Sequence, residues 1–355
     1  MNLLYILNEY QYGAHIDVHK GLERLKKEGY INNYTIYPFL FKISQGLSIE
    51  DICSEIVEQI NKIEPDAIIW SHTSGLKISD DFLKKLKSEY PKIIHLYFDG
   101  DIYQKFYKPL PREVIKLAGF CNVSFWPGYA EFVKELKKEG CKDIRYIPLT
   151  TDEIRFAKTY QLEHKYDVIM IGNYITSRIP FKTWPGSRLR KSTAEFLYKK
   201  YDDKFAIYGN GWEGKRYAKG EVPFEKQGEL YNWAKVSVGV NNLHADYYFS
   251  NRLPIAMSSG KIMIHNYEKG IEKIFNDIKY PYFFKDKEEL SEILENLLKK
   301  SEEELISICS SLREYALNKL TMYSAIKYMT EVAKEKIDNH NIITTNPWLK
   351  EECFN

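Results

Sequence analysis

The sequence lacks the marks of a disulfide scaffold, a zinc domain and a membrane protein. Its five cysteines are odd in number and widely scattered, with no Cys-x-x-Cys pair, so neither disulfides nor a zinc site are indicated. No hydrophobic run approaches the roughly 20 residues of a membrane span, and the first residues do not resemble a signal peptide. These absences predict a cytoplasmic protein without a transmembrane segment.

The chain also has little net charge and no internal repeat. A formal charge of +2 gives no general nucleic-acid signature. Between Arg155 and Lys219, however, basic residues outnumber acidic ones, which an anionic ligand or a lysine-rich solvated helix face would explain equally well. A length of 355 residues with 44% apolar residues exceeds what one core usually supports, so two domains are expected.

Buried-type strands and amphipathic helices alternate along the chain, which predicts parallel sheets covered on both faces. The expected strands of a first Rossmann-like unit are 2–7, 35–41, 66–72, 92–98, 122–127 and 144–149. Those of a second unit are 167–172, 205–209, 236–241, 261–265 and 280–284. Loops at the carboxyl ends of such strands line the ligand cleft.

Residues 244–275 form the most informative stretch, reading as polar loop, short helix, glycine stop, buried strand, second glycine turn and helix. Ser250 and Asn251 are good N-cap residues, and Gly260 ends the first helix. Lys269-Gly270 opens the second helix, whose free amides are expected to face the end of the strand. The expected ligand is an anion, most simply a phosphate.

This stretch resembles the donor-binding half of GT-B glycosyltransferases, most closely the CgeB-like branch of the group 1 superfamily. The family pattern is S-x-R-x-F-E-A-x-A-x-G, then an apolar strand and a G-L-E-x-x-F turn, matched here by 250–260 and 270–275. Segments 166–174, 205–212 and 236–242 resemble other strands of that domain. The resemblance implies an α/β GT-B fold, with two Rossmann-like domains facing across a cleft. Its parts would be an acceptor domain over 1–155, a sugar-nucleotide donor domain over 156–325, and a C-terminal helix and tail over 326–355 that return to the N-terminal domain.

One departure from the family concerns the glutamate that would hold the donor's ribose. Ile255 stands at its position, and Asn242, Asp246 or Glu268 can substitute for it. In related retaining families a second glutamate lies eight residues earlier, where this chain has Tyr247. Retention or inversion is therefore left open.

The departing diphosphate must be neutralised as the glycosidic bond breaks. Arg252 matches the family's arginine, and further arginines follow the Gly172-Asn173 turn; guanidinium suits this task through its planar fork. The predicted donor-binding residues are Gly172, Asn173, Arg178, Arg188, Arg190, Gly209, Asn210, Trp212, Asn242, Asp246, Ser250, Asn251, His265, Glu268, Lys269, Gly270 and Ile271.

The acceptor side is predicted from the loop after the first strand. Gly13 allows a tight turn, and His15 or Asp17 can take the acceptor hydroxyl's proton, although Asp17 is equally suited to capping a helix. The candidate catalytic residues are therefore His15, Asp17 and Arg252. The acceptor cleft is predicted to include Gly13, His72, Asp99 and Asp101.

Two motifs raise the question of a metal. Asp99-Gly100-Asp101 resembles the D-x-D of GT-A glycosyltransferases, but two Rossmann-like halves argue for a metal-independent GT-B site. His15, Asp17 and His19 have a spacing that can bind zinc with a third ligand, and we favour a surface or capping role. No metal and no cofactor is predicted; the nucleotide sugar, with UDP as a candidate nucleotide, is a substrate.

The predicted function is transfer of a sugar from a nucleotide-diphosphate donor to an acceptor hydroxyl on a carbohydrate or other molecule. One alternative is a phage-type enzyme that modifies a hydroxylated base in DNA, which would need a basic cleft rim and base flipping. The balanced charge of the first domain argues against it. Another alternative is a non-catalytic sugar-nucleotide or glycan binder, because the ribose glutamate is missing.

Overall fold

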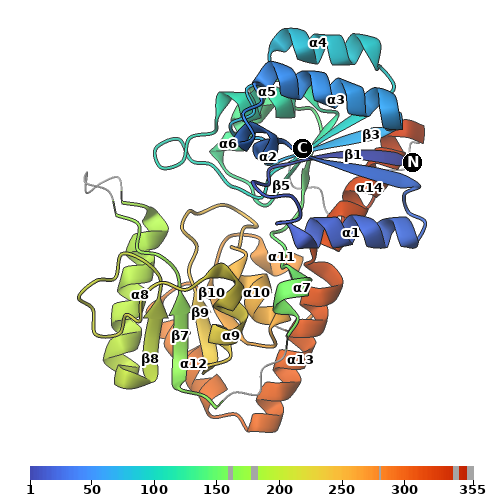
Figure 1. Cartoon of the computed structure of the whole chain (residues 1–355). Coiled ribbons are helices and arrows are strands. Elements are labelled where there is room, and N and C mark those ends of the chain that lie inside the picture. The colour runs from blue at the N-terminus through green and yellow to red at the C-terminus, as the bar shows by residue number, and fades with distance from the viewer. Residues whose placement is uncertain (159–162, 177–182, 280, 339–343, 350–355) are drawn as a thin grey trace. The chain divides into compact units, whose positions relative to one another are not determined.

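The structure is a computed structural model that describes residues 1–158, 163–176, 183–279, 281–338 and 344–349. It divides into two compact units, the first made of Met1–Ile147 with Met322–Asn355 and the second of Pro148–Thr321. The domain boundaries predicted from the sequence lie at residues 155 and 325. Each unit is a parallel sheet flanked by helices (Figure 1).

The sheet of the first unit has the strand order β2-β1-β3-β4-β5-β6, with every pair parallel. Its strands are β1 Asn2–Leu7, β2 Asn33–Pro38, β3 Ala67–Ser71, β4 Ile94–Phe98, β5 Val123–Trp126 and β6 Ile144–Tyr146. Its helices are α1 Ile16–Lys27, α2 Phe39–Ser44, α3 Ile49–Ile63, α4 Asp80–Glu89, α5 Arg112–Phe120, α6 Glu131–Lys138 and α14 Met322–Asp338. Helices α1 and α14 pack together on one face, and α3 and α4 lie on the other (Figure 1).

Local sequence signals explain several of these bounds. Ser48 and Asp51 exchange side-chain and backbone hydrogen bonds in a capping box that starts α3. The predicted strand 35–41 is wrong in its second half. It ends at Pro38, which has no N–H for a further ladder bond, and Phe39 begins a short helix instead.

The second unit has a five-stranded parallel sheet in the order β11-β10-β9-β7-β8. Its strands are β7 Tyr166–Ile171, β8 Phe205–Tyr208, β9 Ala234–Gly239, β10 Met263–Asn266 and β11 Tyr282–Phe284. Its helices are α7 Glu153–Phe156, α8 Pro185–Tyr201, α9 Gln227–Tyr231, α10 Arg252–Ser258, α11 Ile271–Ile274, α12 Lys287–Leu298 and α13 Glu302–Lys319, with short 3₁₀ turns η2 Asp202–Lys204 and η3 Phe224–Lys226.

The segment 244–275 has the predicted order of elements, with two differences. Asn251 is the N-cap of α10 but its side chain makes no capping bond, and α11 is only one turn long. Gly260 follows α10 in the left-handed region, at φ +71°, as expected of a glycine stop. Ile255, at the position of the family's glutamate, is buried in the core.

The C-terminal segment is docked on the first unit. Asn346 donates a hydrogen bond to the Tyr146 carbonyl, and Trp348 is buried against the ring of Tyr328 on α14. Among the described residues, no helix has both the length and the apolar character to cross a membrane.

Candidate functional site

The strand order of the second sheet indicates where a ligand is expected to bind. The chain leaves β7 to form β8 on one side and then β9 on the other. In open parallel sheets, ligands bind at the carboxyl ends of strands where the order reverses in this way, here between the ends of β7 and β9. Residues 172–174 and 240–242 lie at these ends.

Arg190 reaches these strand ends from α8. Its guanidinium donates through Nη1 to the Asn173 carbonyl and through Nη2 to the Val240 carbonyl, the latter at 2.5 Å. The side chain is fully buried. A Cβ at Gly172 would lie 2.8 Å from Arg190 Nε, so glycine there makes room for the guanidinium. Arg190 therefore ties the two strand ends together with a buried positive charge.

Arg252, the first residue of α10, meets Arg190 at the same carbonyl. Its Nη2 donates to the Val240 oxygen at 2.9 Å, and its side chain is only partly buried. Burial and the neighbouring Arg252 lower the pKa of Arg190 well below its ordinary value, and burial lowers that of Arg252. Each Nε lacks a hydrogen-bond partner, and within the described ranges neither guanidinium pairs with a carboxylate. Two guanidiniums without a carboxylate partner among the described residues make the carboxyl ends of β7 and β9 a candidate site for an anion.

Glu268 follows β10, the strand next to β9, and is also buried. Its Oε1 accepts hydrogen bonds from Asn241 Nδ2, Asn266 Nδ2 and His244 Nδ1, at 3.2, 2.7 and 2.8 Å. The bond to Glu268 raises the pKa of His244. Asn241 also accepts from the Ser250 N–H through Oδ1 at 3.0 Å, so this network joins β9, β10 and the loop before α10. The carboxylate is held firmly through one oxygen.

The glycine turns predicted after β7 and β8 pack against each other. Trp212 Nε1 donates to the Gly172 carbonyl at 2.8 Å, and Asn173 Oδ1 accepts the Asn210 N–H at 2.9 Å. A Cβ on Gly209 would lie 2.6 Å from the Gly172 carbonyl oxygen. These five predicted donor residues therefore pack together at the carboxyl ends of β7 and β8.

Other predicted donor residues lie close by in different roles. Asn242 accepts the Gly186 N–H through its carbonyl, and Gly270 lies under the Tyr247 ring at φ +85°. Asp246 pairs with Lys269 at 3.5 Å. The loop also contains Ser250 and Asn251, and Arg188 lies on α8. Arg178 falls outside the described residues.

Two expectations for this region need correction. The helix expected to offer free amides after Gly270 is a single turn, and the Ile271 N–H bonds to the Glu268 carbonyl while its side chain is buried. An anion site on this helix end is therefore not supported. The second expectation is that His265 binds the donor. This histidine is buried, with its Nδ1 near the Asn266 carbonyl, and burial lowers its pKa to about 3.

The first unit has its own order reversal, between β1 and β3. Beyond β1, the buried carboxylate of Glu9 accepts the N–H groups of Gly13 and His15 and contacts His19 Nε2 at 3.1 Å. His15 is the exposed N-cap residue of α1, and Asp17 lies in the first helical turn. The sequence did not single out Glu9; a carboxylate two residues beyond an apolar strand is the signal that could have found it.

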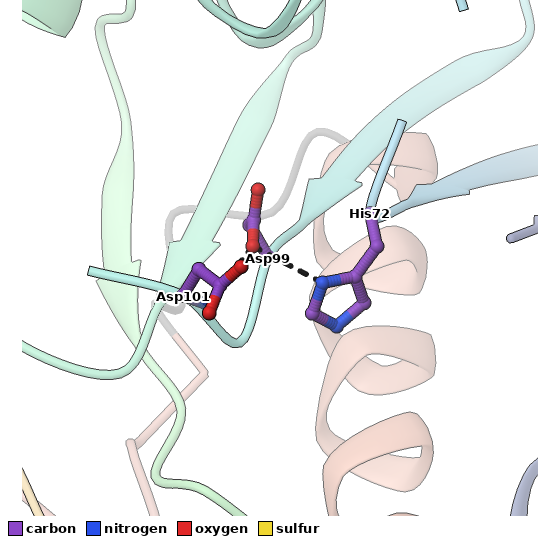
Figure 2. A group of neighbouring side chains, drawn as sticks. All are labelled: His72, Asp99 and Asp101. Carbon is purple, nitrogen blue, oxygen red and sulfur yellow. Dashed lines mark hydrogen bonds and ion pairs between the residues drawn. The ribbon is translucent and has the colours of Figure 1, made fainter. Parts of the chain in front are cut away.

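Beyond β3 and β4, three predicted acceptor residues come together (Figure 2). His72 Nδ1 lies 3.1 Å from Asp99 Oδ1, and one ligand-type atom from each of His72, Asp99 and Asp101 falls within 4.8 Å of the others. Asp99 already accepts four hydrogen bonds, two from phenols, and Asp101 pairs with Lys108 at 2.6 Å. A metal here would have to displace these donors, so the cluster fits a hydrogen-bonded histidine better than a metal centre.

One family model matches part of the chain. Residues 189–330 match the family model described as glycosyl transferase-like. No curated protein sequence matches the chain.

Solved structures match nearly the whole chain at low identity. Anabaena HepE, in complex with UDP-glucose, is 11% identical with a TM-score of 0.54 over 96% of this chain and 100% of its own. A glycosyltransferase from Rickettsia africae is 14% identical with a TM-score of 0.61 over 96% and 99%. The β-glucosyltransferase of phage T4 is 14% identical with a TM-score of 0.51 over 95% and 99%. The predicted GT-B glycosyltransferase fold is confirmed, whereas the CgeB-like branch stays a prediction.

Proposed function

We propose that the protein is a glycosyltransferase that takes a sugar from a UDP-sugar and transfers it to an acceptor hydroxyl. The observation that carries the proposal is the pair of uncompensated guanidiniums of Arg190 and Arg252 at the carboxyl ends of β7 and β9. A diphosphate supplies the missing negative charge, and its charge grows as the glycosidic bond breaks. Arg252 is the residue that contacts the diphosphate, because its side chain is partly exposed. Arg190 is fully buried; it holds the ends of β7 and β9 together and adds to the positive electrostatic potential there.

Glu268 is the proposed ribose contact in place of the family's glutamate, whose position is occupied by the buried Ile255. Three donors fix its Oε1, and among the described residues no donor meets its Oε2, which in this proposal accepts from the ribose hydroxyls. The uracil assignment draws on HepE, whose structures contain UDP-glucose and UDP. DNA as the acceptor and a non-catalytic role stay predictions.

A thermal-shift panel of UDP, GDP, ADP and dTDP tests the donor site, because a ligand that binds only the folded state raises the unfolding temperature. UDP is expected to give the largest shift. Uridine is the matched control, because it lacks the diphosphate and should give a much smaller one. If no diphosphate raised the unfolding temperature at millimolar concentration, the proposed donor site would be wrong.

A further inference from the structure

The most exposed large hydrophobic side chains of the described residues are aromatic and follow strands of the first sheet. Phe106 is 77% exposed, Tyr10 73% and Tyr12 60%. Both tyrosines lie in the loop after β1, and Phe106 lies in the loop after β4. Because the parallel strands have the order β1-β3-β4, both loops leave the sheet at its carboxyl edge, about 10 Å apart. Exposed aromatic rings gathered at one edge indicate an interaction surface.

The loop that carries Phe106 is folded as a hairpin. Gln104 and Lys108 form an antiparallel bridge, with N–H···O distances of 2.8 and 2.9 Å, and the Tyr107 N–H bonds to the Gln104 carbonyl at 3.1 Å. An ion pair of 2.6 Å ties Lys108 to Asp101 at the base of the hairpin. The Phe106 ring is therefore presented to solvent at a fixed place.

The same edge carries positive charge. Lys77 lies in the loop after β3, Lys105 lies in the tip of the hairpin, and Arg112 begins α5. All three residues are exposed, and none pairs with a carboxylate in the part of the chain that the structure describes. Glu113 accepts the Gly75 N–H at 3.2 Å, which joins the loop after β3 to the start of α5. The three cations therefore belong to one surface.

The acidic groups at this edge do not cancel that charge. Glu9 and Asp99 are buried and accept hydrogen bonds from the fold. Asp101 pairs with Lys108. The half-buried carboxylate of Glu113 offsets one of the three exposed cations. The surface keeps a net positive charge between its aromatic rings.

Aromatic rings and basic side chains suit the headgroup region of a lipid bilayer. Tyrosine rings are enriched at that depth, and lysine or arginine is attracted to anionic lipids. Phe106 has no polar side-chain atom, so its ring gains free energy by leaving water. A nucleic acid is a poorer fit, because it is bound through a longer track of phosphate contacts than three cations on separate loops provide.

We propose that this aromatic-basic surface docks the first unit on a lipid bilayer of net negative charge; its residues are Tyr10, Tyr12, Lys77, Lys105, Phe106 and Arg112. The docking is peripheral and reversible, because one hairpin tip and a few cations anchor far less strongly than a membrane-spanning helix. An acceptor anchored in that bilayer would be held at the edge that carries the predicted acceptor residues. The inference goes beyond the proposed function and does not depend on it.

Vesicle flotation with the full chain tests the docking. Vesicles of phosphatidylcholine containing about one third phosphatidylglycerol should carry the protein upward, whereas phosphatidylcholine alone should carry much less. Binding to the anionic vesicles should weaken as salt rises, because salt screens the exposed cations.

Substitutions on the surface separate its apolar and charged parts. Phe106→Ser should weaken binding to the anionic vesicles about tenfold, because the ring no longer leaves water. Lys105→Ala should weaken it about fivefold through the loss of one cation. The matched controls are Ile306→Ser on α13, where the side chain is 58% exposed, and Lys137→Ala in the last turn of α6. Neither control should change vesicle binding, and all four variants should keep the unfolding temperature of the wild type.

Phe106→Trp reports whether the hairpin tip enters the bilayer. Its added fluorescence should move to shorter wavelength with anionic vesicles, because the indole passes from water into a less polar medium. Ile306→Trp is the matched reporter outside the surface, and its added fluorescence should stay unchanged.

The proposal would be wrong if the wild-type protein did not float with anionic vesicles, or if it floated equally well after Phe106→Ser and Lys105→Ala. Binding to single-stranded DNA that these substitutions abolish, without binding to vesicles, would assign the surface to nucleic acid instead. None of these results bears on UDP binding, so the proposed function is tested separately.

Discussion

Arg145 in the first unit and Arg190 in the second are both buried, and they are held in opposite ways. Arg145 pairs with Asp143 at 2.9 Å and with Glu335 at 2.6 Å, which ties β6 to α14. Burial lowers its pKa, but these two carboxylates outweigh burial and raise it. Among the residues that the structure describes, the partners of Arg190 are carbonyl oxygens, and its pKa is lowered. Carboxylates of the fold neutralise the first arginine, whereas in the proposed function a bound diphosphate neutralises the second.

The two sheets also differ in the charged groups at the carboxyl ends of their strands. Glu9 and Asp99 place buried negative charge beside histidines in the first unit, and both carboxylates are satisfied by hydrogen bonds. Arg190, which is fully buried, and Arg252, which is partly exposed, place positive charge at this edge of the second unit, where Glu268 is a buried carboxylate. Two sheets of similar topology thus carry different charged groups at their carboxyl edges, because the residues at the strand ends decide the site and the fold only places it.

The largest loss of stability is expected when one of the two carboxylates that pair with Arg145 is neutralised. Glu335→Gln should lower the free energy of unfolding by about 3 kcal/mol, because it leaves Arg145 buried beside one carboxylate instead of two. Urea denaturation measures this loss. Glu89→Gln, which removes half of an exposed pair on α4, should change stability by less than about 0.5 kcal/mol.

The same pair predicts a pH dependence of stability. The Arg145 and Thr344 contacts lower the pKa of Glu335 to about 2, against burial, which would raise it. A carboxyl with a depressed folded-state pKa contributes stability above its unfolded value, near 4.5, and this contribution is lost as pH falls toward 2. The stability difference between wild type and Glu335→Gln should therefore shrink over that window; a difference independent of pH would contradict the pairing.

The next effect concerns the uncompensated arginines. Arg252→Ala should lower kcat/KM for donor turnover by about 100-fold, or about 2.7 kcal/mol, because it removes a charged contact to the leaving diphosphate. Arg252→Lys retains the charge without the planar fork and should recover part of the loss. Normal turnover by a folded Arg252→Ala variant would show that the alignment of 250–260 with the family is wrong.

A smaller effect is expected from Glu268. Glu268→Gln should weaken UDP binding by about tenfold, or about 1.4 kcal/mol, through the loss of a charged hydrogen bond to ribose. The 2′-deoxy analogue of UDP is the matched ligand. If Glu268 holds the ribose hydroxyls, the losses from the variant and from the analogue are not additive; fully additive losses would place the ribose elsewhere.

No effect is expected from metal removal. Turnover should survive EDTA, because two guanidiniums carry the diphosphate charge and Asp99 is occupied by four donors. Complete loss of turnover that manganese or magnesium restores would make His72, Asp99 and Asp101 metal ligands.

The sequence was informative where local chemistry decides structure. Alternating strands and helices predicted two parallel sheets, and the 244–275 pattern located α10 and β10. Ile255 was identified as a departure from the family and is a core residue. Periodicity alone predicted a strand through Phe41, because it does not register the missing N–H of Pro38.

The geometry of the site was beyond sequence reasoning for a physical reason. Arg190 and Arg252 are 62 positions apart and meet only because β7 and β9 are neighbours, so their shared carbonyl at Val240 depends on tertiary structure. The His72–Asp99 contact likewise joins the ends of two strands. Tyr97 and Tyr103, which satisfy Asp99, carried no signal of their own among the 28 tyrosines of the chain.

Calorimetric titration of UDP and of uridine into the wild-type protein tests the central claim most directly, because it isolates the diphosphate at the arginine pair. We expect UDP to bind one site with an affinity that falls as salt rises, and uridine to bind at least about 100-fold more weakly, since it lacks the charge that the guanidiniums need. Equal affinity for UDP and uridine, or no heat with UDP at millimolar concentration, would contradict it.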